Sequence, residues 1–159
     1  MSRPEITRRE NAEDRVTRFA SEAGIPLLRI GLGVVYLWFG ALKLFPGGSP
    51  AQDLVERTVS ALTSGIVHGD LARLSAAITE IGIALVLLSF RAPRLVAVLL
   101  IGHVLLIGHV LLVSTPLVLF PGEMWAGPLQ ASFEAQYILK NLVTVAAAVV
   151  IASSHPRVR

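Results

Sequence analysis

The chain has 159 residues, of which 53% are hydrophobic and 16% are charged. This composition is too apolar for an ordinary soluble domain, so we expect a protein that resides in a membrane. The sequence contains no cysteine, which excludes disulfides, thiol chemistry and thiolate-bound metal sites supplied by this chain. Membrane orientation alone would produce a formal net charge of +3, so nucleic acid is not expected as a partner.

Residues 1–23 form a charged arm in which both signs are mixed, with a thin apolar stripe at Ile6, Val16 and Phe19. We interpret this segment as a cytoplasmic arm that is either soluble or lies on the membrane surface. The apolar run starts only at Gly24 and continues for the length of a membrane span. A cleaved secretory signal has a shorter apolar core nearer the start, so we expect the first helix to stay uncleaved.

Four apolar segments are long enough to cross a hydrocarbon core, at residues 26–45, 71–90, 95–120 and 133–152. Lysine and arginine concentrate in the arm, in the short connection at residues 91–94 and in the tail at residues 153–159. Such residues collect on the cytoplasmic side of a membrane, so both termini are expected there. The sequence therefore predicts an all-α, integral membrane four-helix bundle over residues 24–152.

The two outer connections differ in character. In the first, Ser49, Pro50 and Gln52 suit the N-cap, the first helical position and the capping partner of a short helix. The apolar residues that follow recur at helical spacing: Leu54, Val55, Val59, Leu62 and Ile66. This amphipathic helix could lie on the outer interface or fold back over the bundle as a lid. The other connection, residues 121–128, is rich in turn-forming residues.

Polar residues inside the predicted spans are the most informative, because a charge at mid-bilayer is costly and usually faces protein. Glu80 lies about halfway along the second span on a stripe of small residues, Ala72, Ala76 and Ala84, which predicts that it faces another helix. In the first span one polar and small seam is formed by Arg29, Gly33, Tyr36, Gly40 and Lys43. Arg29 and Lys43 could instead extend to the headgroups, whereas Tyr36 lies deeper and needs a hydrogen-bond partner.

Other polar residues in the third and fourth spans lie at depths similar to that of Glu80. At about 1.5 Å per residue, Lys140 lies about 10 Å and Glu80 about 14 Å from the outer end of their spans, so the two could meet. Asn141 adds a donor and an acceptor beside Lys140. The sequence thus predicts one polar cluster in the middle and outer half of the bundle, made of Glu80, Lys140, Asn141, His103, His109, Tyr36 and Lys43.

From the residues alone, several interpretations of this cluster stay open. It can be a structural staple in which Glu80 and Lys140 neutralise each other. It can also be a pocket for a ligand or quinone headgroup, which needs hydrogen-bond donors beside an apolar slot, or a proton or ion path. A metal site is not expected, because the spacing of His103 and His109 does not place both rings on one ion.

Several strings of the sequence resemble the DoxX superfamily, particularly its YkgB-like branch: Arg29 to Phe45 (RIGLGVVYLWFGALKLF), Ser49 with Pro50, Glu80 with Gly82, and Phe133 to Val143 (FEAQYILKNLV). The resemblance covers about Arg29 to Ala152. It implies a multi-pass protein of a bacterial inner membrane with four transmembrane helices, in agreement with the spans above. Some relatives are membrane subunits of a thiosulfate:quinone oxidoreductase, and others are associated with superoxide dismutase and a sulfurtransferase.

The resemblance implies redox-associated work, and we expect an accessory or quinone- or lipid-pocket subunit of a membrane redox or detoxification assembly. Such a subunit would hold no covalent cofactor and would not be an enzyme on its own. Its expected partners are the lipid bilayer, the subunits of a redox enzyme and, as an alternative, further copies of the chain. Two other functions stay open: a non-catalytic structural partner of a larger membrane complex, and a small proton-coupled transporter.

Overall fold

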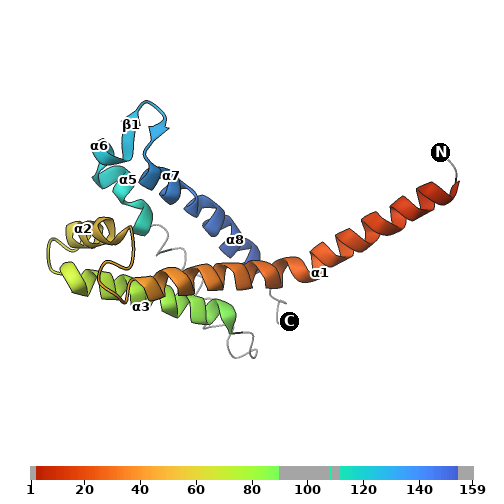
Figure 1. The fold of residues 1–159 in the computed structure, drawn as a ribbon, viewed down its shortest axis with the longest axis horizontal. Coiled ribbons are helices and arrows are strands. Elements are labelled where there is room, and N and C mark those ends of the chain that lie inside the picture. Colours follow the sequence, from red (N-terminus) through yellow and green to blue (C-terminus); the bar gives the residue numbers. More distant parts are fainter. Residues whose placement is uncertain (1–2, 90–107, 109–111, 154–159) are drawn as a thin grey trace.

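The computed structural model describes residues 3–89, 108 and 112–153 of the chain. These residues are mostly helical (Figure 1), in the elements α1 (Arg3–Leu42), α2 (Gln52–Leu62), α3 (Gly69–Leu88), α5 (Pro116–Leu119), α6 (Pro121–Met124), α7 (Phe133–Leu139) and α8 (Asn141–Ser153). A small antiparallel hairpin, β1 (Trp125–Gly127) and β2 (Gln130–Ala131), lies between α6 and α7. The turn-rich connection predicted from the sequence thus contains a short helix and two strands, so the chain is not purely α-helical.

Three helical stretches of the described residues are long and apolar enough to cross a membrane: Ala12–Leu42, Gly69–Leu88 and Phe133–Ser153. They overlap the first, second and fourth predicted spans, although the first helix begins well before residue 26. Most of the predicted third span, residues 95–120, lies outside the described residues. At its described end a turn at Thr115 precedes α5, where Pro116 occupies the first helical position and lacks the donor that a continuing helix would use.

The charged arm is helical and continuous with the first span in α1. Its N-terminal part projects beyond the other helices (Figure 1), and Val16 and Phe19 of its apolar stripe are 68% and 65% exposed. Pro26 lies inside α1, where its missing N–H leaves the carbonyl group of Glu22 without the usual helical donor. The sequence left the conformation of the arm open, and the structure makes it an extension of the helix.

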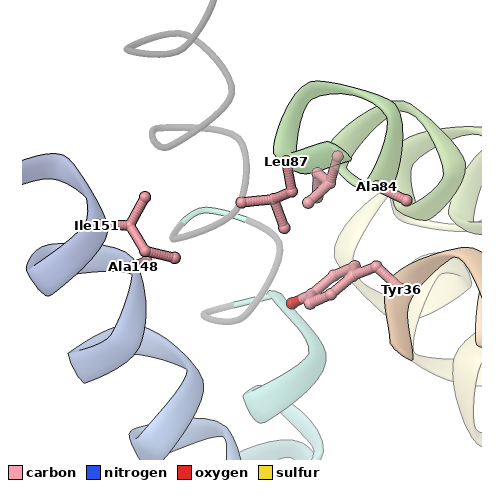
Figure 2. Packing of buried hydrophobic residues seen from close by; sticks show 6 residues of the cluster. Tyr36, Ala84, Leu87, Ala148 and Ile151 are labelled. Atoms are coloured by element: carbon pink, nitrogen blue, oxygen red, sulfur yellow. The ribbon is translucent and has the colours of Figure 1, made fainter. Parts of the chain in front are cut away.

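The antiparallel helices α1 and α3 pack closely, and two glycines of the predicted seam make this approach possible. A Cβ atom on Gly33 would lie 2.6 Å from Cγ of Leu88, and one on Gly40 would lie 2.8 Å from Cγ1 of Ile81. The buried core beside this contact contains Tyr36, Ile83, Ala84, Leu87, Ala148 and Ile151 (Figure 2). The prediction that the seam and the stripe of Glu80 face protein is confirmed.

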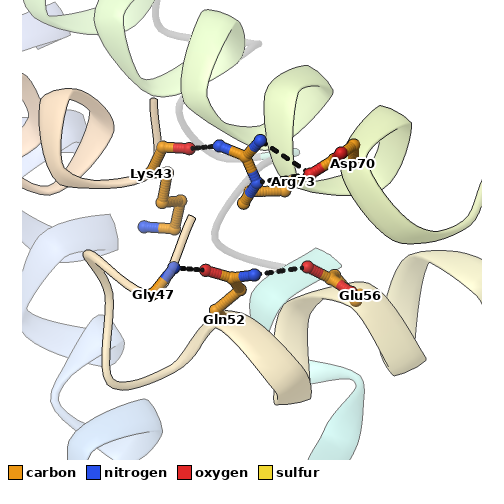
Figure 3. Close-up of polar contacts among 6 residues, drawn as sticks. All are labelled: Lys43, Gly47, Gln52, Glu56, Asp70 and Arg73. Carbon is orange, nitrogen blue, oxygen red and sulfur yellow. Dashed lines mark hydrogen bonds and ion pairs between the residues drawn. The ribbon is translucent and has the colours of Figure 1, made fainter. Parts of the chain in front are cut away.

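Each helix of this pair supplies an arginine to the carboxyl end of the other. Arg29 of α1 donates from Nε to the carbonyl oxygen of Leu87 and from Nη2 to that of Ser89, both at 3.3 Å. Arg73 of α3 donates to the carbonyl oxygen of Lys43 and to Oδ1 of Asp70 (Figure 3). Positive charge at the carboxyl end of a helix is favourable and satisfies carbonyl groups that have no helical partner. Arg29 is therefore engaged with α3, whereas the sequence also allowed it to extend to the headgroups.

The predicted helix of the first outer connection is present as α2, but its start differs from the expected capping box. The helix begins at Gln52, and no side chain caps it. The side chain of Gln52 instead accepts a hydrogen bond of 2.7 Å from the N–H of Gly47 and donates one of 2.8 Å to Glu56 (Figure 3). Gln52 therefore ties the preceding loop to α2, because Gly47 reaches its amide oxygen.

Candidate functional site

A cavity of about 340 Å³ lies where α1, α2, α3, α7 and α8 come together. Most of its wall is apolar, with side chains such as Leu32, Val35 and Phe39 of α1 and Leu54 and Val55 of α2. Polar groups are few and come from every side: Tyr36, Lys43, Ser49, Thr58, Glu80, Glu134, Asn141 and Thr144. An apolar cavity with a small number of convergent polar groups is the usual character of a small-molecule site.

A buried ion pair forms part of the cavity wall. Nζ of Lys43 lies 2.8 Å from Oε2 of Glu80, and the two residues are only 5% and 6% exposed. The same Nζ donates to the carbonyl oxygen of Phe39 at 3.4 Å. Burying one of these charges alone would be strongly unfavourable, and the pairing offsets much of that cost. The sequence allowed Lys43 to extend to the headgroups, and the structure places it inside the protein instead.

The ion pair of Glu80 is with Lys43 and not with Lys140, the partner expected from helix depth. The close approach at Gly40 explains the choice, because a Cβ on Gly40 would lie 3.1 Å from Cβ of Glu80. Lys43 follows less than one turn later on the same seam. Lys140 is exposed at the junction between α7 and α8, so its ammonium group is not part of the cavity wall.

Two further predicted residues do line the cavity. Tyr36 is 9% exposed and its ring extends from α1 towards the face of α8 that carries Ala148 and Ile151 (Figure 2). Asn141 begins α8 and is half-buried in the wall. Of the predicted cluster, the structure thus brings together Tyr36, Lys43, Glu80 and Asn141. His103 and His109 lie outside the described residues.

Sequence reasoning missed the polar residues that α2 and its preceding loop contribute. Ser49 and Thr58 are both buried and line the cavity, and the hydroxyl group of Thr58 donates to the carbonyl oxygen of Leu54 at 2.6 Å. Thr58 lies four residues after Leu54 and next to Val59, on the predicted apolar stripe. This position on the stripe was the signal that could have identified it.

The side of α2 away from the cavity carries a cluster centred on Arg57. Its guanidinium group contacts Glu123 of α6 through two bonds of 2.9 Å each and Asp53 at 3.0 Å, and it lies 5.2 Å from the ring centroid of Phe120. The hydrogen bond from Arg57 holds the pKa of the Glu123 carboxyl group below its ordinary value of 4.5. Because a lowered carboxyl pKa favours the ionised form, this contact is present at neutral pH and is lost only on acidification through that lowered pKa.

The comparisons with known proteins leave the chain without an identified relative. No protein-family model, no curated protein and no solved structure matches it. Within the described part of the chain, no group of three or more histidine, cysteine, aspartate or glutamate residues is placed to hold a metal ion.

Proposed function

We propose that the protein is a membrane subunit whose cavity binds a quinone headgroup or a lipid group of similar size, and that it serves as an accessory subunit of a membrane redox or detoxification assembly. The observation that carries this proposal is an apolar cavity of about 340 Å³ whose wall contains the Lys43–Glu80 ion pair. The sequence resemblance to the DoxX superfamily is what suggests the redox or detoxification setting.

The cavity suits a ring with carbonyl or hydroxyl groups better than a charged ligand. Its volume is at the lower end of the range of about 300–1,000 Å³ for ligand pockets. The buried charges of Lys43 and Glu80 already neutralise each other, and the other charged residue of the wall, Glu134, is exposed. The ammonium group of Lys43 and the side-chain amide of Asn141 can donate to a carbonyl oxygen, while the apolar wall holds the ring. The residues of this chain would bind and orient the ligand, and electron transfer would involve the partner subunit.

The described helices support a membrane bundle with an even number of crossings. α3 runs from the end where α2 lies to the opposite end, where Arg29 contacts Ser89. α5 and α6 lie beside α2 again, so Ser89 and Pro116 lie at opposite ends of α3. Together with the charge bias of the arm and tail, this placement supports four spans with cytoplasmic termini. The resemblance to the DoxX superfamily suggests a bacterial inner membrane.

Solvent extraction of the purified protein tests the ligand. We expect quinone at a near-stoichiometric level, and we expect a short-chain ubiquinone to bind about five- to tenfold more weakly to Asn141→Leu, which removes the hydrogen bond that the side-chain amide would donate to the ligand. Ser75→Ala, an exposed position of α3 outside the cavity, is the matched control and should leave the affinity unchanged. Phospholipid without quinone, together with no measurable quinone binding, would contradict a quinone site.

A structural partner subunit is the second candidate, because the Lys43–Glu80 pair also joins α1 to α3. Pull-down from the native membrane in a gentle detergent, followed by mass spectrometry against an untagged control, tests the accessory role that both candidates share. We expect a dehydrogenase, oxidase, dismutase or sulfurtransferase in a fixed ratio. Recovery of the chain alone would contradict that role and leave the bundle to act by itself.

A further inference from the structure

We propose that α2 is a gate over the cavity, hinged along α3 and latched to α6 by Arg57. The proposal deepens the proposed function and rests on it only in treating the cavity as a binding site. Opening would separate α2 from α5 and α6 while α2 keeps its contact with α3. A ligand would then reach the cavity from the end of the bundle that carries α2, through water or headgroups.

One face of α2 forms a wall of the cavity. Leu54, Val55, Thr58 and Val59 all line it, and Thr58 is almost completely buried there. Leu54 also packs against a small apolar cluster of Met124, Ala135 and Ile138, which closes the side of α2 that faces α6 and α7. Movement of α2 away from this cluster would expose both the cluster and the cavity.

The opposite face of α2 carries the latch. Among the described residues, Arg57 and Glu123 form the hydrogen-bonded side-chain contact that joins α2 to a part of the chain far away in sequence. The other side-chain hydrogen bonds of α2 are local: those of Gln52 with Gly47 and Glu56, and that of Thr58 with Leu54. The side chains of Arg57 and Glu123 are 41% and 52% exposed, so water competes with the latch and keeps it weak. A gate that must open thermally needs such a weak contact.

The loops at both ends of α2 contain residues in the left-handed backbone region. Gly47 has a φ of +74° before the helix, and Ser64 and Gly65 have φ values of +51° and +82° after it. Glycine adopts this region without steric cost and commonly provides the turns that flank moving elements. These turns let α2 end abruptly on both sides, so it can rotate about its contact with α3 as one rigid piece.

The absence of cysteine from the sequence allows a direct test with a single Thr58→Cys thiol in nanodiscs, where both faces are accessible. We expect a membrane-impermeant maleimide to label this buried thiol slowly, and about three- to fivefold faster when Arg57→Ala or Glu123→Ala removes the latch. Asp53→Ala is the matched control, because it removes a contact of Arg57 within α2 and leaves the bond pair to Glu123 intact. It should not accelerate labelling.

The exposed position Ala61→Cys on α2 corrects for the intrinsic reactivity of the thiol and should label at one rate in every background. Ser49→Cys, also buried in the cavity wall, replaces Thr58→Cys if that variant does not fold. Two results would overturn the gate. One is an equal labelling rate of Thr58→Cys with and without the latch, and the other is labelling of Thr58→Cys as fast as that of Ala61→Cys in both the native and the unlatched protein. This readout needs no ligand, so such a result would not contradict quinone binding. Absence of quinone from the purified protein, in turn, would not contradict the gate.

Discussion

At the scale of single residues, the Lys43–Glu80 pair has both a structural and a binding aspect. The carboxylate holds the ammonium group at the cavity wall, and the carbonyl oxygen of Phe39 accepts a second hydrogen bond from it. A charge in this position needs a partner that stays in place, because removing either partner leaves the other buried and uncompensated. The packing of α1 against α3 therefore depends on an ion pair that a ligand in the cavity can also contact.

Two substitutions of Glu80 separate charge from hydrogen bonding. Glu80→Gln keeps an oxygen that accepts from Lys43, whereas Glu80→Ala leaves the ammonium group with a single described acceptor, the carbonyl of Phe39. We expect Glu80→Ala to cost about 3–5 kcal/mol and to lower the yield of monodisperse protein in gel filtration far more than Glu80→Gln does. Wild-type yields for both variants would show that the packing of α1 against α3 does not need the Lys43–Glu80 pair.

The sequence allowed part of the site to be predicted at this scale. Glu80 and Tyr36 could be assigned to a protein-facing position because a polar group in an apolar run is costly unless it is buried in protein. The partner of Glu80 could not be chosen from depth along the helices, since depth ignores how closely two helices approach. The approach depends on Gly40 meeting Ile81 across the interface, which is a tertiary contact that one helix alone does not reveal.

At the scale of elements, the contact between α1 and α3 is controlled by small residues and fixed at both ends by arginines. The glycines let the backbones approach, and the contacts of Arg29 with Leu87 and of Arg73 with Lys43 set the register. A shift of one helix by one turn would break both arginine contacts together. The helices themselves and the small helix α2 could be predicted from periodicity, but these long-range contacts depend on register and could not.

Alanine at two glycines of α1 tests this close approach. At Gly40 the added Cβ would lie 2.8 Å from Cγ1 of Ile81 and 3.1 Å from its backbone nitrogen, so α1 must move away from α3. We expect Gly40→Ala to destabilise the protein by about 1–3 kcal/mol in a denaturant titration in detergent. The control, Gly31→Ala, meets nothing within 4 Å and should stabilise by about 0.5–1 kcal/mol through helix propensity. Equal effects at the two positions would refute the packing argument.

At the scale of the whole molecule, the two ends of the helices carry different elements. α2 and β1 lie at one end of the helices, and the arm of α1 and the end of α8 lie towards the other (Figure 1). An even number of crossings keeps the two termini on one side, and an odd number separates them. The predicted third span lies mostly outside the described residues, so the number of membrane crossings is tested by cysteine labelling.

Single exposed cysteines provide that test in a chain that has none of its own. We expect an impermeant maleimide to label Ala61→Cys and Ala126→Cys in intact inner-membrane preparations with the outer face exposed. Ser21→Cys on the arm and Ser153→Cys at the end of α8 should react only after the membrane is broken, because the four proposed crossings would return the chain to the cytoplasmic side. Labelling of Ser21→Cys and Ser153→Cys from opposite sides would show an odd number of spans.

The close pairing of α1 with α3 also determines the order in which the molecule can assemble during its synthesis. The described groups that join these two helices, including both arginine contacts and the buried ion pair, are available once residue 89 has left the ribosome. Asn141 follows about 50 residues later, which requires several seconds of synthesis at about 5–20 residues per second. The first half of the chain can therefore be a finished hairpin while the ribosome still holds the second, and the cavity is completed last, when Asn141 and Thr144 arrive.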